Sequence, residues 1–213
     1  MAKKTVQTKW LLFAVLTVIL SFQVSLYAQT EKGIELFNAY EFGKAEQLFR
    51  DQLKTDPGNT EAGYYLGLSL YMQKRYEDAL AVFKGIKDAK KEIPHNNGRL
   101  EIMMTRICLE LKKYPEALKS LEDAKAAKAD PADIHVCQGG YYLETGDPKK
   151  AIAELEEAIK IDPDNAYAYY YAGYAYVRLG LPSDGEKALK KFLELAPYAP
   201  EAENVKILVD ALC

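Results

Sequence analysis

The sequence predicts an all-α fold in which antiparallel helix pairs stack into a solenoid. The first observation is a small residue that recurs at spacings of 34, 38, 34 and 34 positions, at Ala45, Ala79, Ala117, Ala151 and Gly185. The second is an apolar residue four positions after each of these, at Phe49, Phe83, Leu121, Leu155 and Leu189. The third is a column twelve positions before them, with glycine in all units but one, at Gly33, Gly67, Thr105, Gly139 and Gly173. Three columns with one period indicate a repeated unit.

The composition is that of a folded chain stabilised by packing. The 213 residues are 49% apolar and 28% charged, which suits one compact domain or a short repeat array and is too apolar for a disordered chain. The 13 Gly and 9 Pro exclude collagen-like and Pro-rich sequence, and three Cys are too few for a small disulfide-rich fold. A net charge of -3 gives no electrostatic reason to expect a nucleic acid as the partner.

The first 28 residues have the layout of a secretory signal peptide. Three lysines and no acid precede the apolar run WLLFAVLTVIL at 10–20. Polar residues then lead to the small Ala28, so we expect cleavage between Ala28 and Gln29. The alternative is an uncleaved anchor, because residues 10–27 approach the roughly 17 to 25 apolar residues that a membrane span needs. In both cases the basic start predicts export of the rest, which after cleavage carries 25 basic and 31 acidic residues.

We expect five helix pairs, followed by a capping helix at 200–213. Apolar residues at spacings of three and four predict the helices. Prolines cannot continue a helix interior, and the sequences TDPGNT at 55–60 and IDPDNA at 161–166 therefore predict turns between units, where Asp56, Asp162 and Asn165 supply capping side chains. The units are 29–59, 60–93, 98–131, 132–165 and 166–199, with an insertion at 94–97. The capping helix covers the apolar face that the last unit would otherwise expose.

These columns resemble the tetratricopeptide repeat family, whose 34-residue helix-turn-helix unit has small residues at positions 8 and 20, a large apolar residue at 24 and Pro at 32. The resemblance covers residues 29–199. Thr105, Ala129 and Lys91 depart from it, at position 8 or 32 of their units. It implies a right-handed superhelix in which the first helix of each pair lines a concave groove.

The resemblance also implies which side chains face that groove. The candidate contacts for a protein or peptide are Tyr64, Leu68, Tyr71, Arg99, Arg106, Val136, Gly140, Tyr167, Tyr170, Tyr174 and Arg178. Tyrosine is a favoured contact residue because it brings a large rigid ring and a hydroxyl at low entropic cost. The alternative is that about half of the tyrosines in 167–176, including Tyr171 and Tyr176, pack between helices. The Lys and Asn clamp with which chaperone-binding members of the family hold a carboxylate is absent at the matching positions.

The sequence gives little support for catalysis, a metal or a cofactor. The chain has two histidines, His95 in the insertion and His135 at a helix start, and no glycine-rich phosphate-binding motif. The three cysteines, Cys108, Cys137 and Cys213, have no metal-ligand spacing. We expect the first two to be small buried residues, with a disulfide between them as the alternative.

The leading hypothesis is therefore a non-enzymatic, exported scaffold that binds a protein or peptide in the cell envelope, on the periplasmic side of a Gram-negative bacterium. One alternative is a glycan-binding accessory protein, which requires coplanar, solvent-facing rings at Tyr170 and Tyr174. Another is a membrane-tethered assembly factor, if residues 1–28 remain attached. No cofactor and no nucleic acid are expected, and the membrane would be contacted only through the N-terminal segment.

Overall fold

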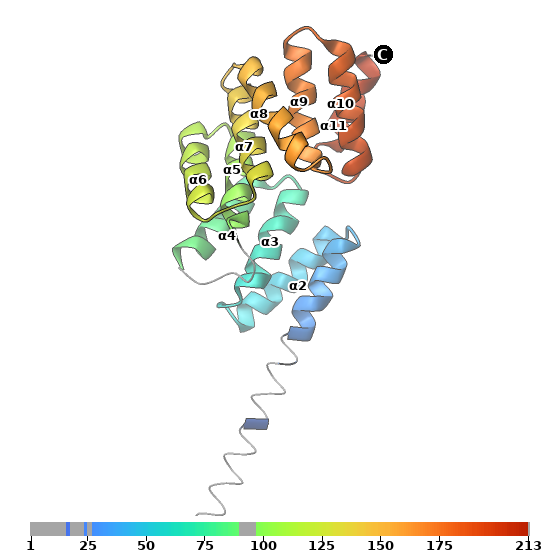
Figure 1. Cartoon of the computed structure of the whole chain (residues 1–213). Coiled ribbons are helices and arrows are strands. Elements are labelled where there is room, and N and C mark those ends of the chain that lie inside the picture. The colour runs from blue at the N-terminus through green and yellow to red at the C-terminus, as the bar shows by residue number, and fades with distance from the viewer. Residues whose placement is uncertain (1–15, 18–23, 25–26, 90–96, 213) are drawn as a thin grey trace, which may run out of the picture.

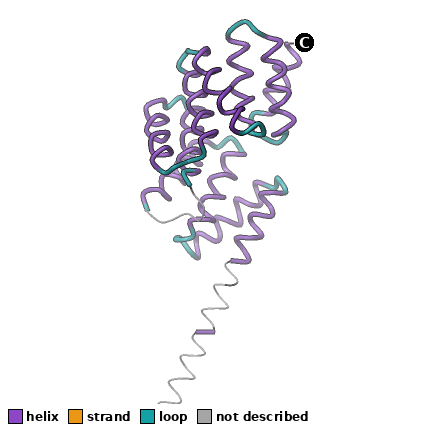
Figure 2. The backbone as a smooth tube through the Cα atoms, viewed as in Figure 1, coloured by secondary structure: helices purple, strands orange, loops and turns teal. Residues whose placement is uncertain are grey.

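The computed structural model describes residues 16–17, 24, 27–89 and 97–212, where all regular secondary structure is helical. A helical stretch at 27–38 precedes the elements α2 (Phe42–Thr55), α3 (Thr60–Met72), α4 (Tyr76–Asp88), α5 (Arg99–Glu110), α6 (Tyr114–Ala126), α7 (Pro131–Glu144), α8 (Pro148–Ile161), α9 (Ala166–Arg178), α10 (Pro182–Leu195) and α11 (Ala202–Leu212). Antiparallel pairs follow one another along the chain (Figure 1), and the described connections between helices are short loops (Figure 2). The predicted all-α solenoid is confirmed.

Each unit of the sequence repeat contains one helix pair. The first helices of units two to five are α3, α5, α7 and α9, and their partners are α4, α6, α8 and α10. The first unit pairs the 27–38 stretch with α2. Helix α7 begins one residue before the predicted start of its unit, because Pro131 occupies its first turn and Asp130 caps it.

The same contact between a small and a large residue holds four of the five pairs together. A Cβ atom added at Gly67 would lie 2.4 Å from the Phe83 ring, and one at Gly139 would lie 2.5 Å from Leu155 Cγ. The pairs Gly33 with Phe49 and Gly173 with Leu189 repeat this geometry at 2.5 Å. The first helix therefore approaches its partner so closely that only hydrogen fits at this position.

The third unit has threonine in place of glycine at this close contact between helices. Thr105 replaces glycine and is fully buried, and its hydroxyl donates a hydrogen bond to the Glu101 carbonyl at 2.8 Å. Leu121, the partner of this position, is 2% exposed. A buried hydroxyl bonded within its own helix leaves no unpaired polar group in the core, so the unit accepts the larger side chain.

A left-handed residue ends the first helix of every unit. The positions are Tyr40, Lys74, Lys112, Gly146 and Gly180, with φ between 55° and 93°. In each turn the next residue donates its N–H to a carbonyl five residues back, as from Arg75 to Leu70 at 3.0 Å. This is the Schellman motif, which satisfies carbonyls that the helix end leaves unpaired. The turn geometry is thus conserved along the array even where the residue is not glycine.

Helix α11 covers the end of the array, as expected. Val205 and Val209 are buried against Leu189 and Phe192 of α10. The two described cysteines are free thiols, with Cys108 1% exposed and Cys137 fully buried. They occupy separate apolar clusters, as small buried residues.

Most of the predicted leader lies outside the described residues. Ala28 and Gln29, the predicted cleavage site, lie near the start of the 27–38 helical stretch and are exposed. In the described ranges, no helix combines the length and the apolar character needed to span a membrane.

The array curls until its two ends meet. The rings of Tyr40, in the turn before α2, and Tyr198, between α10 and α11, have centroids 4.0 Å apart. Glu201, which follows the same loop, lies within hydrogen-bonding distance of Tyr71 in α3. In Figure 1, α2 lies at the lower right and α11 at the upper right of the view. This closure decides what remains accessible on the concave side.

Replacing Gly139 by Val is expected to lower the stability of the fold by about 1 to 3 kcal/mol, because the added Cβ overlaps Leu155 and the helix pair must separate. The matched control is Gly85→Val in α4, where nothing lies within 4 Å of an added Cβ and Val is a slightly better helix former than Gly. Urea unfolding followed by circular dichroism measures both variants. Equal midpoints would contradict the packing argument.

Candidate functional site

The centre of the concave side is filled by four interacting side chains, which we call the closing cluster: Tyr71 of α3, Arg106 of α5, Tyr167 of α9 and Glu201. The hydroxyls of Tyr71 and Tyr167 each donate a hydrogen bond of 3.0 Å to one carboxylate oxygen of Glu201. Arg106 Nη2 donates to the Tyr71 hydroxyl at 3.3 Å. The Arg106 guanidinium also lies 3.2 Å from the centroid of the Tyr167 ring, a cation–π contact.

Burial strengthens these contacts, because water cannot readily replace the partners. Tyr71 is 3% exposed and Glu201 5%, so neither can exchange its partner for water. Burial raises the pKa of Tyr71 well above its usual value and that of Tyr167 to about 12, and both hydroxyls therefore remain protonated donors at neutral pH. Arg106 Nε is buried without a hydrogen-bond partner, which leaves the guanidinium dependent on its aromatic neighbours and on the nearby carboxylate.

The closing cluster corrects part of the groove inferred from the sequence. Tyr71 and Val136 are 3% and 2% exposed, and Gly140 is buried. An added Cβ at Gly140 would lie 3.0 Å from the Tyr171 ring, so the small residue makes room for tyrosine packing. These three residues lie in the interior of a closed array and do not line an open groove, and Arg106 and Tyr167 are partly buried beside them.

The tyrosines of α9 divide between core and surface. Tyr171 is 3% exposed and belongs to the core, as the packing alternative predicted. Tyr176 is partly buried: its ring packs against the edge of the same core cluster, and its hydroxyl donates to Glu156 at 3.3 Å. Tyr170 packs against Phe192 and Tyr174, with ring centroids 5.2 and 5.0 Å away.

A pocket remains open where the first helices of units three, four and five end. Its volume is about 310 Å³, and we call it the tyrosine pocket. Its lining residues are Leu109, Glu110, Lys112, Leu143, Glu144, Tyr170, Tyr171, Tyr174 and Arg178. Three of the groove residues inferred from the sequence, Tyr170, Tyr174 and Arg178, therefore meet in one place. Glu110, which holds the matching groove position in the third unit, lies with them.

Glu110 combines a raised pKa with the lack of a partner in the described part of the chain. Among the described residues it makes no hydrogen bond or ion pair. Burial, and then the charge of Glu201, raise the pKa of Glu110 to about 7. Glu144, its counterpart in the next unit, is paired: Arg178 Nη2 lies 3.5 Å from its carboxylate, and Arg178 Nη1 donates to the Leu143 carbonyl.

A second pocket, of about 490 Å³, lies at the opposite ends of α5, α7 and α9. Arg99 lines it and is exposed, whereas Tyr64 is half-buried against Phe83, with ring centroids 5.7 Å apart. Its polar groups are largely used within the fold: the Asp130 side chain accepts from the Ala132 N–H at 2.8 Å, and Asn165 Nδ2 donates to Asp133 at 3.0 Å. Leu68, the remaining groove residue, is partly buried in the first core cluster.

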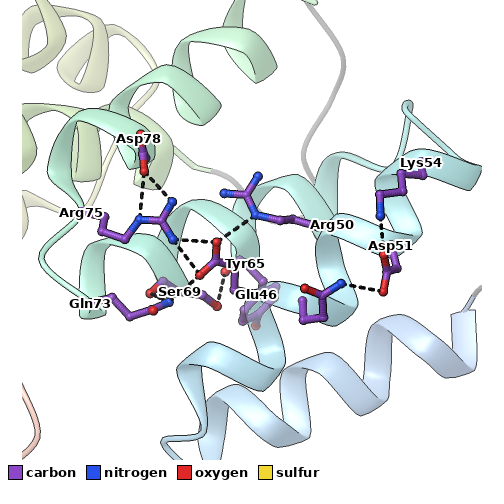
Figure 3. Close-up of polar contacts among 10 residues, drawn as sticks. Glu46, Arg50, Asp51, Lys54, Tyr65, Ser69, Gln73, Arg75 and Asp78 are labelled. Carbon is purple, nitrogen blue, oxygen red and sulfur yellow. Dashed lines mark hydrogen bonds and ion pairs between the residues drawn. The ribbon is translucent and has the colours of Figure 1, made fainter.

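A third polar assembly joins the first two units, on α2 and the turn between α3 and α4 (Figure 3). The Glu46 carboxylate accepts hydrogen bonds from Arg75 at 2.8 and 3.0 Å, from Gln73 at 2.9 Å and from Arg50 at 2.8 Å. Although burial opposes ionisation, these donors hold the pKa of Glu46 below its usual value. Every acceptor position is filled, so this network stabilises the junction and offers nothing to a ligand.

Chemistry-bearing side chains do not converge elsewhere in the part of the chain described. No group of three or more His, Cys, Asp or Glu side chains there could hold a metal ion. His135 Nδ1 lies 2.7 Å from Glu154 on the neighbouring helix, and His95 lies outside the described residues.

Comparisons with known proteins agree with this architecture. A family described as TPR repeat matches residues 139–180, and one described as anaphase-promoting complex, cyclosome, subunit 3 matches residues 38–124. The DnaJ homolog subfamily C member 3 of Gallus gallus is 24% identical over 84% of this chain, which spans only 30% of that relative.

Solved structures share the fold at low sequence identity. A thermophilic TPR protein of Thermus thermophilus superposes with a TM-score of 0.68 at 21% identity, over 88% of this chain and 98% of its own. YrrB, described as a TPR protein with an unusual peptide-binding site, gives a TM-score of 0.52 at 21% identity, over 84% and 90% of the two chains.

Glu201→Ala is expected to destabilise the fold by about 2 to 4 kcal/mol, because it leaves the hydroxyls of Tyr71 and Tyr167 without their acceptor and removes the negative charge near Arg106. Glu203→Ala is the matched control, since this side chain is 76% exposed in the same segment and should change stability by less than about 0.5 kcal/mol. Chemical unfolding measures both. A loss no larger than that of the control would show that the cluster does not hold the ends together.

Glu110→Gln is expected to stabilise the protein at pH 8 and not at pH 5. The folded-state pKa of Glu110 is raised to about 7, so folding favours the protonated form. That stabilisation is fully present below about pH 4.3, the unfolded pKa, and is lost as the pH rises through 7. Glutamine stays neutral, and its advantage at pH 8 should be about 1 to 3 kcal/mol.

Thermal unfolding of wild type and variant at the two pH values measures this difference. Glu77→Gln, at an exposed position of α4, is the control and should behave like the wild type at both. A pH-independent effect of Glu110→Gln would show that Glu110 ionises as it does in water.

Proposed function

We propose that this chain, which belongs to the tetratricopeptide repeat family, is a non-enzymatic scaffold that binds a protein or peptide partner. Members of this family generally serve as scaffolds without catalysis, and a stack of helix pairs provides a rigid surface that extends over several units.

The observation that carries the proposal is the tyrosine pocket. Tyr174 and Tyr170 line it together with Arg178, and aromatic and arginine side chains are the residues that most often dominate binding energy at protein interfaces. The neighbouring interior is closed by Glu201, so a partner meets the array at this pocket and along its margins. A similar fold carries a peptide-binding site in YrrB, as its description states, which supports the proposal.

The second open surface contributes less to the proposal. Arg99 is exposed at the second pocket, close enough to the half-buried Tyr64 to interact with it, whereas Leu68 packs against the first core cluster. Their polar neighbours are bonded within the fold, so we place the main anchor in the tyrosine pocket.

We further propose that the scaffold is exported to the periplasm or cell envelope. The support is the order of basic, apolar and small residues in 1–28. Mass spectrometry of the protein isolated from its source tests it. A first residue at Gln29 supports cleavage and export, whereas an intact start favours the membrane-tethered assembly factor.

The glycan-binding alternative lacks the geometry that it requires. The rings of Tyr170 and Tyr174 are inclined by 61° to each other, and both are partly buried. A sugar face stacks on a flat exposed platform, and these two rings do not form one. We therefore favour a protein or peptide partner.

Tyr174→Ala is expected to weaken partner capture at least about tenfold, because the ring is a wall of the tyrosine pocket. Tyr176→Ala is the matched control: it lies on the same helix, is also partly buried, and contacts Glu156 outside the pocket. Tyr170 is unsuitable, because its ring packs against Phe192 and its removal would disturb the core.

The experiment is a pull-down from the source cell's envelope extract with the immobilised chain and both variants, followed by mass spectrometry. A protein retained by the wild type and by Tyr176→Ala, and lost with Tyr174→Ala, supports the proposal. Retention by all three proteins would place the binding surface elsewhere.

A further inference from the structure

We propose that the tyrosine pocket holds a basic side chain, a lysine ammonium or an arginine guanidinium, that the partner supplies. This inference rests on the proposed function and adds to it the chemistry of the anchoring residue. Four features of the pocket carry it: an unpaired carboxylate, an internal precedent for pairing it, the convergence of three helix ends, and aromatic walls.

The first feature is that Glu110 has no ion-pair partner among the described residues, although Lys112 and Arg178 line the same pocket. The partly buried Arg106 contacts the Tyr71 hydroxyl and the rings of Tyr71 and Tyr167, where Glu201 already supplies a negative charge. Two carboxylates thus surround one guanidinium. Glu110 lines the pocket, and its carboxylate pairs with neither Lys112 nor Arg178.

The second feature is the pairing that the chain itself makes one unit later. Helices α5, α7 and α9 end at equivalent positions of their units, at Glu110, Glu144 and Arg178. Arg178 reaches back to the preceding unit, where it pairs with Glu144 and donates to the Leu143 carbonyl. The residue in the same place relative to Glu110 is Glu144, an acid. The cation that completes unit four is therefore missing from unit three.

The third feature is the direction of the three helices. Helices α5, α7 and α9 all end at this pocket, and a helix C-terminus carries a partial negative charge from its unpaired carbonyls. The bond from Arg178 to the Leu143 carbonyl demonstrates that these groups accept from a cation. A partner's ammonium or guanidinium would meet the same environment beside Glu110.

The fourth feature is the pocket wall. Tyr170, Tyr171 and Tyr174 present aromatic rings, which attract cations as well as apolar stems. The Arg106 guanidinium over the Tyr167 ring is an example of the same contact in this chain. A volume of about 310 Å³ is at the small end of ligand pockets, which fits one long side chain better than a folded segment.

Binding should depend on pH through Glu110, whose pKa is raised to about 7 by burial and by the charges of Glu201 and Glu144. Arg106 and Lys74 oppose this rise, Lys112 lines the same pocket, and the phenols of Tyr76, Tyr170, Tyr171 and Tyr174 also face the carboxyl. A bound cation favours the ionised form, so affinity should rise between pH 6 and pH 8.

The test titrates the full-length, isotope-labelled chain with N-acetyl-lysine N-methylamide and follows backbone amide shifts. The same molecule with an acetylated side-chain nitrogen is the probe control. We expect saturable shifts at the ends of α5, α7 and α9 with the lysine probe only. Glu110→Gln should weaken this binding at least about tenfold and abolish its pH dependence, whereas Glu77→Gln should leave both unchanged.

Equal binding of the two probes, or unchanged lysine binding by Glu110→Gln, would overturn the inference. Loss of folding is not a confounding result, because Glu110→Gln is expected to be at least as stable as the wild type. The proposed function is judged separately by the Tyr174→Ala pull-down. If that variant loses a partner while the lysine probe fails to bind, the scaffold stands and the basic anchor does not.

Discussion

The bond from two tyrosine hydroxyls to the carboxylate of Glu201 is the constraint on which the shape of this molecule depends. A solenoid of helix pairs is stabilised only by contacts between neighbours, so its ends have no reason to meet. Here Tyr71 and Tyr167 hold the segment before α11 on the concave side, because both hydroxyls bond to Glu201 of that segment. Arg106 in turn donates to the Tyr71 hydroxyl. Closure fills the middle of the concave side, and pockets stay open at the two ends of the first helices, the tyrosine pocket at one of them.

The fold could be predicted from the sequence because its determinants are local and periodic. The column of small residues represented by Gly67 and Gly139 corresponds to positions where an added Cβ would overlap Phe83 or Leu155, so the spacing encodes a physical contact. The positive φ of the residues that end the first helices could not be predicted in this way. A lysine such as Lys74 has no preference for positive φ, and its conformation is imposed by the helix pair around it.

The candidate site was predictable only in part, because its accessibility depends on contacts between residues far apart in the sequence. Family positions identify the side chains that leave the first helices on the concave side, and this brought Tyr170, Tyr174 and Arg178 into one surface. Which of those side chains are covered depends on residue 201, which lies 130 positions from Tyr71. No local sequence pattern predicts a contact between residues so far apart. The raised pKa of Glu110 could not be predicted either, because it depends on burial and on the charge of Glu201.

The closing cluster also limits how this protein can change in length. Open repeat arrays gain or lose units readily, because each unit needs only its neighbours. In this chain an additional unit would rotate and translate Glu201 away from Tyr71 and Tyr167, leaving buried polar groups unpaired on both sides. Unit number is thereby coupled to the stability of a single cluster, and duplication of a unit, the usual route by which such arrays grow, carries a penalty here that an open array does not have.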